Sequence, residues 1–225
     1  MSTFAIGDIH GCLTALETLY VSAGITNRDS VIFLGDYVDR GPNSAQVINW
    51  ILEIEVDKLI TLRGNHEIMM MEFRNLGPHS NPHSSSWLKY GGSETLSSYH
   101  IAHSDRWYEH VPQEHWRFLE NTLPYYNLGD IIFVHAALRP TVPLHQQLPQ
   151  ALFWKKLENP KAYAPNKKVI CGHTAQKDGN IANYGHTICI DTCAYGGQWL
   201  TCLDVDSGQY WQANQTGDVR MGRLD

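Results

Sequence analysis

The sequence of 225 residues lacks any long apolar segment. None of its hydrophobic runs approaches the ~20 residues that a membrane-spanning helix needs. The chain passes from Met1 straight into a short apolar run at residues 3–6, without the positively charged region of a secretory leader. We therefore expect a soluble protein of the cytoplasm that has no membrane partner.

Cysteine is scarce and poorly spaced for a structural role. The five cysteines are odd in number and contain no Cys-x-x-Cys pair, which argues against a disulfide framework and against a thiolate zinc site. They are Cys12, Cys171, Cys189, Cys193 and Cys202. We expect them to be buried, reduced thiols.

Positive charge is also in deficit. The chain has 17 Lys and Arg against 23 Asp and Glu, a net charge of −6 and an isoelectric point of about 6.0. No basic field therefore favours stable binding of nucleic acid or of an anionic membrane. A phosphorylated substrate is not excluded, because a bound pair of divalent cations would dominate the local field.

The remaining composition is that of an ordinary folded domain. Hydrophobic residues make up 43% of the chain and charged residues 18%, a balance that argues against extensive disorder. The length fits one domain over residues 1–225, which we expect to act as a monomer. Residues 213–225 are polar and contain glycine, so we expect a loose tail there.

Short apolar runs rich in Val, Ile and Phe predict β-strands, several of them buried. They lie at residues 3–6, 31–34, 59–62, 131–134, 169–171, 186–190 and 199–205. Helical spacing of apolar residues in 13–20 and 47–52 predicts helices between the first three strands, which favours a parallel sheet with right-handed crossovers. Residues 67–122 are typical of helices and loops, with a loop at 77–83 that we expect to border a cleft.

The residues directly after several predicted strands carry metal-binding side chains. These segments are Gly7-Asp8, Gly35-Asp36, Gly64-Asn65, His135 and Gly172-His173. Ligands of open α/β sheets collect beyond the carboxyl ends of the strands, so the segments can converge on one rim. Mixed carboxylate and imidazole ligands without thiolate suit manganese, iron or zinc.

Each segment also has an ordinary structural explanation. A Gly-Asp pair after a strand forms turns, Asn65 can cap the helix that follows, and His135 or His173 can be a buried histidine with a hydrogen-bond partner. Their occurrence together on successive strand ends favours the metal site. His186 is an alternative last ligand, but it begins a predicted strand whereas His173 follows one.

Three longer motifs carry a family resemblance. Residues 7–11 (GDIHG), 35–41 (GDYVDRG) and 64–67 (GNHE) resemble the signature motifs of the phosphoprotein phosphatases, bacterial and phage serine/threonine protein phosphatases included, within the calcineurin-like metallophosphoesterases. The resemblance extends through residues 133–136 and 171–174 and covers most of the chain. It implies an α/β (α+β) fold, the four-layer αββα sandwich in which two mixed sheets pack face to face with helices outside.

The same resemblance implies a centre of two divalent metal ions. By that likeness Asp8, His10 and Asp36 hold the first ion, and Asp36, Asn65, His135 and His173 hold the second. Such ions lie about 3.5–4 Å apart, with Mn²⁺ the expected cofactor and Fe, Zn, Ni or Co as alternatives. With only two anionic ligands the site stays net positive and attracts a phosphate dianion. Because the histidines must be neutral to bind metal, we expect metal loss on mild acidification.

The second and third motifs imply the remaining roles. Arg40 can give paired donors to phosphate oxygens, and Asn65 can contact the substrate as well as a metal. His66, kept protonated by Asp39, can donate a proton to the leaving alkoxide. For Arg40 and Asp39 the alternative is a salt bridge in a surface turn.

One part of the family pattern is missing. Relatives present a second phosphate-binding arginine, which follows a tryptophan in the bacterial and phage forms, whereas residues 153–157 here are Phe-Trp-Lys-Lys-Leu. Either Lys156 takes its place, as a point charge without the guanidinium fork, or Arg139 does. Two solvated lysines on a helix are the plain alternative. Trp87 and Gly91-Gly92 resemble a segment of bacterial relatives, for which we expect a packing role.

These inferences predict a dinuclear metal-dependent phosphomonoester hydrolase that acts on phosphoserine or phosphothreonine proteins, with dual specificity for phosphotyrosine as an extension. Hydrolysis of dinucleoside polyphosphates, of small phosphoesters or of nucleic-acid ends are the enzymatic alternatives in the same superfamily. A metal-binding regulatory module without turnover is the remaining class, and the complete set of Asp39, Arg40 and His66 argues against it.

Overall fold

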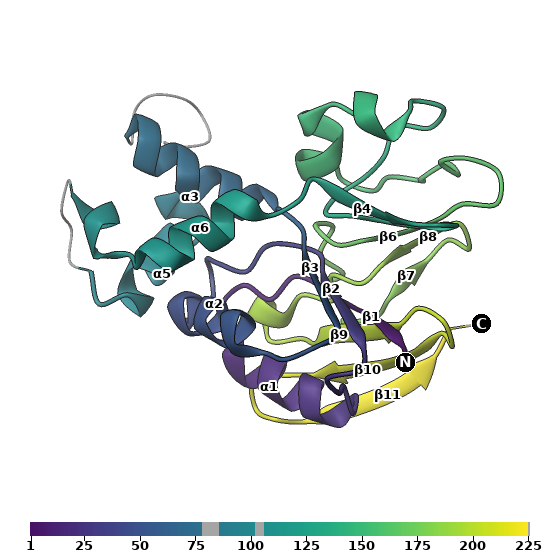
Figure 1. Cartoon of the computed structure of the whole chain (residues 1–225), viewed down its shortest axis with the longest axis horizontal. Helices are drawn as coiled ribbons and strands as arrows, with labels where there is room; N and C mark the ends of the chain where they lie inside the picture. Colours follow the sequence, from purple (N-terminus) through teal and green to yellow (C-terminus); the bar gives the residue numbers. More distant parts are fainter. Residues whose placement is uncertain (78–85, 102–105, 225) are drawn as a thin grey trace.

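The structure, a computed structural model, describes residues 1–77, 86–101 and 106–224. Its strands are β1 (Thr3–Ile6), β2 (Ser30–Phe33), β3 (Lys58–Thr61), β4 (Tyr125–Leu128), β5 (Ile131–Val134), β6 (Lys168–Cys171), β7 (Ala182–Asn183), β8 (Thr187–Cys189), β9 (Leu200–Asp204), β10 (Gln209–Ala213) and β11 (Val219–Arg223) (Figure 1). Its longer helices are α1 (Leu13–Ser22), α2 (Ser44–Glu53), α3 (Asn65–Leu76), α5 (Gly92–Ser98) and α6 (Gln113–Asn121). Within the described ranges, no helix is long and apolar enough to cross a bilayer.

The larger sheet contains the predicted parallel core. Its strand order is β11-β10-β9-β1-β2-β3, and β1, β2 and β3 run parallel with α1 and α2 as crossovers. In this register Ile6 lies opposite Phe33, and Phe33 lies opposite Thr61. The three strands therefore end level with one another, and the loops that follow them start from one edge.

The smaller sheet repeats this arrangement with the second half of the chain. Its order is β4-β5-β6-β8-β7, in which β5, β6 and β8 are parallel and the flanking β4 and β7 are antiparallel. Both sheets are mixed, as the family resemblance implied. The carboxyl ends of β5 and β6 are the points from which His135 and the Gly172-His173 segment leave the sheet.

The two sheets pack face to face through alternate side chains of their strands. Ala5, Ile32 and Leu203 of the larger sheet meet Phe133 and Ile170 of the smaller sheet in a fully buried cluster. Because successive strand residues point to opposite faces, neighbours such as Phe4 and Val31 instead pack outward. The contact between the sheets fixes the relative position of their two rims.

The outer faces of the sheets are covered unequally. Phe4, Ile6, Val31 and Phe33 pack in one cluster with buried residues of α1 and α2. Over the smaller sheet the cover consists of the short helices η3 (Leu144–Gln146) and η4 (Gln150–Trp154) and the loops beside them. The αββα order is thus present, with a thinner fourth layer.

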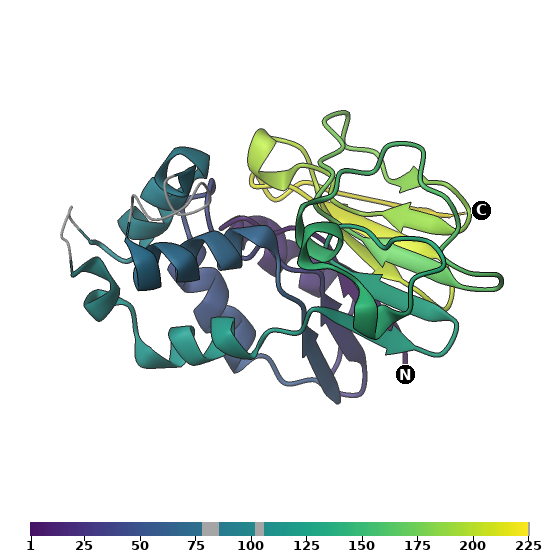
Figure 2. The ribbon, with the colours of Figure 1, turned by 90° about the horizontal axis from the view of Figure 1, so that it is seen from above.

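The remaining helices form an arm to one side of the sheets, which comprises α3, the short helices η1 (Leu88–Tyr90) and η2 (Trp107–His110), α5 and α6 (Figures 1 and 2). Aromatic rings fill its interior. Ring centroids lie 4.9 Å apart for Phe73 and Trp87, 5.1 Å for Trp87 and Trp107, and 5.7 Å for Trp107 and Trp116. The arm begins at Asn65 and therefore starts from the rim itself.

Two expectations from the sequence differ from the structure or fall outside it. Residues 213–225 were expected to form a loose tail, but residues 219–223 form β11, which pairs with β10 along its whole length. Alternating exposure along β11 is typical of an edge strand with one solvated face. The loop expected at residues 77–83 lies, from residue 78 onward, outside the described residues.

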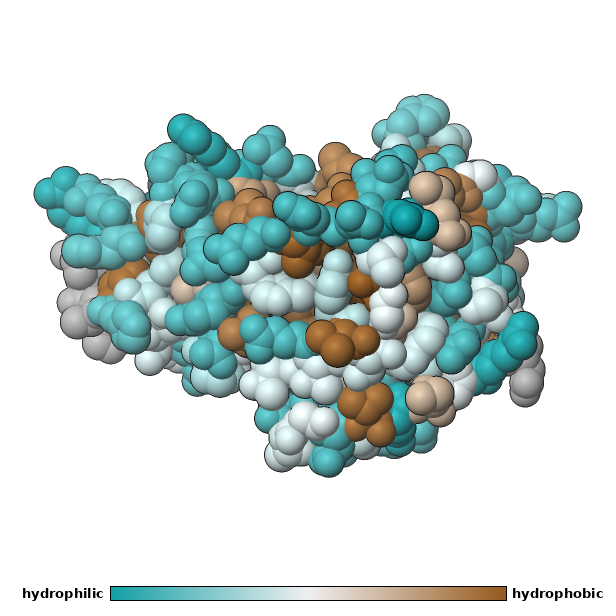
Figure 3. Space-filling view, turned by 60° about the horizontal axis from the view of Figure 1, so that its bottom comes forward, coloured by the Kyte–Doolittle hydropathy of each residue, from teal (hydrophilic) through white to brown (hydrophobic). Residues whose placement is uncertain are grey.

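The surface agrees with the acidic, polar composition. Figure 3 shows hydrophilic side chains over most of one face, with apolar residues in small separate groups. Exposed apolar side chains such as Val21, Leu52 and Met221 are of the kind that globular surfaces tolerate singly. The strongest concentration of buried charge lies at the shared rim of the two sheets.

Candidate metal centre

The predicted ligands lie on tight loops directly beyond the strands. Positive φ angles occur at His10 (47°), Asp36 (54°) and His173 (62°), and again at Asp39 (74°) and Arg40 (69°). Residues other than glycine rarely adopt this left-handed conformation, and such strain gathers at functional sites where the surrounding structure enforces it. The loops thus hold these side chains in place before any ligand arrives.

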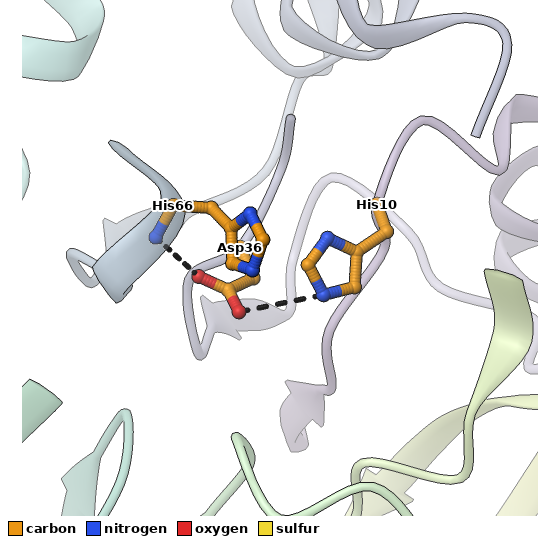
Figure 4. Close-up of side chains that lie close together, drawn as sticks. All are labelled: His10, Asp36 and His66. Atoms are coloured by element: carbon orange, nitrogen blue, oxygen red, sulfur yellow. Dashed lines mark hydrogen bonds and ion pairs between the residues drawn. The ribbon is translucent and has the colours of Figure 1, made fainter. Parts of the chain in front are cut away.

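Asp36 occupies the middle of the cluster. Its Oδ2 lies 3.4 Å from Nε2 of His10 and 3.5 Å from Nε2 of His135, and its Oδ1 accepts a hydrogen bond from the His66 amide at 3.1 Å. Figure 4 shows Asp36 between His10 and the start of α3. Two groups of potential ligands share it: one with His10 and His66, the other with His135 and His173, each within 4.8 Å.

Backbone carbonyls set the orientation of the three predicted histidine ligands. Nδ1 of His10 lies 2.9 Å from the Val38 carbonyl, and Nδ1 of His135 lies 2.9 Å from the Leu34 carbonyl. His173 is turned the other way, with Nε2 3.0 Å from the Trp154 carbonyl. Since a carbonyl can only accept, each of these nitrogens carries the proton, and the opposite nitrogen keeps its lone pair. Metal-binding histidines are usually oriented in this way.

The lone pairs of His135 and His173 then face an acceptor rather than a donor, whereas Nε2 of His10 faces a guanidinium nitrogen of Arg40. Oδ1 of Asn65 lies 3.1 Å from Nε2 of His135 and 2.9 Å from Nδ1 of His173. Lone pairs that face one another at this range repel unless a cation lies among them. The donor set of carboxylate oxygen, amide oxygen and imidazole nitrogen fits divalent manganese, iron or zinc.

Asp8 supports the same interpretation. Its Oδ2 accepts from the His173 amide at 2.9 Å, whereas Oδ1 is buried and has no hydrogen-bond partner among the described residues. A side chain on Gly172 would collide with that oxygen, so the backbone passes close to it only because residue 172 is glycine. A buried carboxylate oxygen without a donor is costly, and a cation would satisfy it.

Burial shifts the ionisation of the cluster in opposite directions. Desolvation lowers the pKa of His135 to about 3 and that of His173 to about 3, which leaves both imidazoles neutral at pH 7. Desolvation, with the nearby charges of Asp191 and Asp36, raises the pKa of Asp8 well above its usual range. In the metal-free chain His135 and His173 therefore compete for protons less than ordinary histidines do, and the raised pKa of Asp8 makes its carboxyl the stronger competitor.

With this geometry established, comparison with known proteins assigns the family. The sequence pattern of the calcineurin-like phosphoesterases matches residues 1–197, a span that contains every predicted site residue. The chain belongs to the calcineurin-like phosphoesterase family. It is a metal-dependent phosphoester hydrolase.

Proteins similar to this phosphoesterase carry names that refer to different substrates. It is 25% identical over 227 residues to the asymmetrical bis(5'-nucleosyl)-tetraphosphatase PrpE of Oceanobacillus iheyensis, which covers 85% of this chain and 84% of the relative. A protein named provisionally as a diadenosine tetraphosphatase has a similar structure (TM-score 0.69, 16% identity, 98% of this chain and 92% of that chain). A serine/threonine phosphatase of Saccharomyces cerevisiae has the same fold (TM-score 0.58, 14% identity, 100% and 80%).

The predicted acid pair of this phosphoesterase is buried beside the ligand cluster. Nδ1 of His66 lies 2.6 Å from Oδ2 of Asp39, as the motif implied. We expected the pair to keep His66 protonated, but desolvation lowers the pKa of His66 to about 4. The imidazole of the free protein is therefore neutral at pH 7, and it would have to gain a proton when substrate binds before it could act as an acid.

Arg40 lies against the first predicted metal ligands. One guanidinium nitrogen lies 2.8 Å from Nε2 of His10, and its central carbon lies 4.3 Å above the ring of Tyr195. The Arg40 amide donates to the Gly91 carbonyl at 3.2 Å. The backbone amide of Arg40, one guanidinium nitrogen and the flat face of the guanidinium group are thus all in contact with neighbours. A residue in a surface turn lacks such contacts.

The structure distinguishes Lys156 from Arg139, the two candidates for the second phosphate contact. Nζ of Lys156 donates to the His173 carbonyl at 3.0 Å, and its charge contributes to the lowered pKa of His173 after burial and His135. Arg139 is exposed and lines a different surface pocket, together with Leu148 and Lys155. Lys156 is thus the cation that the fold places beside the cluster.

Several residues of the site were missed or undervalued in the sequence. Glu67 is buried and accepts from the amides of Gly64 at 2.8 Å, Asp36 at 2.9 Å and Tyr37 at 2.8 Å, so it ties the second motif to the third. Its place beside His66 in the GNHE motif was the available signal. Tyr195 lies in a segment that contained no motif we recognised. His186 bonds to Thr187 and belongs to neither ligand group in the described chain.

Proposed function

We propose that this phosphoesterase removes phosphate from phosphoserine and phosphothreonine in proteins. The buried Asp39–His66 pair carries the proposal, because serine and threonine leave as strongly basic alkoxides that need a proton. A phosphoanhydride releases a phosphate group that is stable as an anion, so its hydrolysis gains little from a general acid. The chemistry of this pair therefore favours a phosphomonoester of an alcohol.

The residues fit two divalent ions, with Mn²⁺ the foremost candidate, held by Asp8, His10, Asp36, Asn65, His135 and His173. Bound ions supply the Lewis acidity that makes water nucleophilic near neutral pH. Arg40 offers planar donors to two phosphoryl oxygens, and the Asn65 amide nitrogen is available to a third. His66 gives its proton to the departing oxygen while Asp39 holds the ring.

Hydrolysis of dinucleoside polyphosphates is the second candidate. It is supported by the name of the Oceanobacillus relative, whose alignment covers 85% of this chain. A cavity of about 250 Å³ beside Lys156 is also lined by Lys155 and Lys161, where further phosphates of such a substrate could be neutralised. Small phosphoesters form a third group that the same centre can accommodate.

One assay series separates these candidates. Phosphate release is measured from a phosphoserine peptide, from diadenosine tetraphosphate and from p-nitrophenyl phosphate, each with Mn²⁺ and with a chelator. We expect the phosphopeptide to give the highest kcat/KM and the chelator to abolish turnover. Preference for the dinucleotide by more than about tenfold would transfer the assignment to the second candidate, and no turnover with any metal would remove both.

The cellular location and the oligomeric state of the protein are part of the same proposal. We infer that the protein is cytoplasmic, which is supported by five free cysteines that are all buried, and that it acts as a monomer. Size-exclusion chromatography with light scattering tests the monomer directly, and a dimer at micromolar concentration would overturn it.

A further inference from the structure

Trp87 and Gly91-Gly92 were expected to have a packing role, yet the side chains of Trp87 and of nearby Thr95 hydrogen-bond to the carboxylate of Asp39. We propose that Trp87 and Thr95 are positioning residues that hold the Asp39–His66 pair in its proton-donating orientation. The inference rests on the proposed function, because it assigns to these residues a role in the same protonation step.

Trp87 reaches Asp39 from the aromatic interior of the arm. Its Nε1 lies 3.0 Å from Oδ1 and 3.0 Å from Oδ2 of Asp39, and its side chain is fully buried. The N–H of a buried tryptophan needs an acceptor, and here that acceptor is the carboxylate that contacts His66. Hydrogen bonds to an ionised acceptor are about twice as strong as neutral ones.

Thr95 holds the same carboxylate from α5. Its hydroxyl donates to Oδ1 of Asp39 at 2.7 Å and accepts from the Asp39 amide at 2.8 Å. Ser44 at the start of α2 lies 3.1 Å from the Thr95 hydroxyl and 3.0 Å from the Asp39 amide. Side chain and backbone of Asp39 are therefore fixed together, with Oδ2 aimed at His66.

The paired glycines of the segment explain how it approaches so closely. Gly91 has φ of 113°, and a side chain there would strike the backbone of Arg40. A side chain on Gly92 would strike the Trp87 ring. The Gly-Gly pair thus lets one short segment touch Arg40 on one side and carry the indole on the other.

These contacts predict a defect confined to leaving-group protonation. With Asp39 loosened, His66 loses the partner that fixes its Nδ1 proton and hence the direction of Nε2. Metal binding depends on other residues and should be retained. A substrate whose leaving group needs no proton should be cleaved nearly as before.

The test uses Trp87→Phe and Thr95→Val in the full chain loaded with Mn²⁺. Turnover is compared for a phosphoserine peptide, phenyl phosphate and p-nitrophenyl phosphate, whose leaving groups become progressively less basic. We expect kcat to fall by about 10–100-fold for the peptide and by less than about threefold for p-nitrophenyl phosphate, with KM and Mn²⁺ content unchanged. His66→Asn provides the reference for complete loss of the proton donor.

Matched controls separate positioning from packing. Trp107→Phe removes the same atoms from a ring that packs against Trp87 and, within the described chain, has no hydrogen bond to Asp39, so it should leave the substrate pattern unchanged. Thr95→Ser keeps the hydroxyl and should restore peptide turnover. Equal losses for all three substrates in both Trp87→Phe and Thr95→Val would overturn the inference.

The outcome also separates this inference from the proposed function. A wild-type protein that cleaves phenyl phosphate but not the phosphopeptide refutes the protein substrate, while the two monoesters still report on Trp87 and Thr95. A wild-type protein that cleaves only the dinucleotide overturns both, because no alkoxide is then protonated.

Discussion

The positively charged side chains of Arg40 and Lys156, both beside the metal centre, are held very differently. Arg40 has its guanidinium against His10 and Tyr195 and its amide against Gly91, and its neighbour Asp39 receives hydrogen bonds from Trp87 and Thr95. Lys156 is exposed, and among the described residues its ammonium hydrogen-bonds to the His173 carbonyl alone. We refer to these as the Arg40 side and the Lys156 side.

The difference indicates a division of labour. Groups that must meet a transition state are held rigidly before the substrate binds, because their positions decide the rate. A flexible lysine provides charge without direction and tolerates substrates of different shape. We therefore expect the Arg40 side to determine the rate of the reaction and the Lys156 side to contribute to the choice of substrate.

Asp36→Asn gives the largest expected effect, because Asp36 is shared by both ligand groups. Loss of one of only two anionic ligands should lower bound metal below one ion per chain and reduce kcat/KM by about 1,000-fold or more. Metal content by mass spectrometry and turnover of p-nitrophenyl phosphate provide the measurements. Asp178→Asn, at an exposed carboxylate, is the control, and retained activity in Asp36→Asn would remove the shared ligand from the centre.

Arg40→Ala should cost about 100-fold in kcat/KM, since it removes two directed donors from a partly buried position. Arg40→Lys should recover only part of this loss, because an ammonium cannot replace the planar fork. Kinetics with p-nitrophenyl phosphate measure both variants. Full activity of Arg40→Lys would show that the Arg40 side supplies charge alone, and the contrast with Lys156 would disappear.

Lys156→Ala should have a smaller effect, about 3–10-fold, and should act on KM more than on kcat. Lys156→Arg restores the residue found in relatives and should be at least as active as the natural chain. The exposed Lys177 gives a matched control as Lys177→Ala. A loss in Lys156→Ala that exceeds that of Arg40→Ala would reverse the comparison.

The smallest effect concerns protons released on metal binding. A histidine whose pKa lies near 3 is unprotonated at pH 6, so Mn²⁺ displaces no proton from His135 or His173. Burial and the nearby charges of Asp191 and Asp36 raise the pKa of Asp8, so this carboxyl rather than the histidines is the ligand from which Mn²⁺ displaces a proton as the pH falls. Calorimetry in two buffers of different ionisation enthalpy should therefore find fewer protons released near pH 6 than three ordinary histidines would give.

The Asp8→Asn variant should bind Mn²⁺ more weakly and release almost no proton. Release of three protons by the natural chain would mean that the histidines keep ordinary pKa values, and the burial argument would then be wrong.

Local sequence predicted the ligand cluster well because each ligand follows a strand directly. Parallel strands of matched register place Asp8, Asp36 and Asn65 at one edge of the sheet. The positions of these residues directly after the strands are therefore enough to predict that they lie together. The contact between Trp87 and Asp39 joins residues 48 positions apart, and no local pattern encodes where an indole points. The same limit applies to the choice between Lys156 and Arg139.

Strand β11 shows the limit for the fold. Residues 219–223 read Val-Arg-Met-Gly-Arg, a weak alternation with glycine inside, and propensity alone favours coil. Its five paired positions with β10 stabilise the strand, and that partner is available only once the larger sheet exists. The metal ligands could be predicted because they directly follow strands with clear apolar patterns, whereas β11 forms only through its pairing with β10.

The hydrogen bond between Nδ1 of His135 and the Leu34 carbonyl has a consequence for the order of assembly. Leu34 directly follows β2, and His135 comes 101 positions later from the other sheet. A nascent chain that has made only its first half possesses Asp8, Asp36 and His10, but it lacks His135 and His173. The full ligand set therefore comes together only after both sheets have packed against each other. An ion bound by all of these ligands would indicate that both halves of the chain have folded.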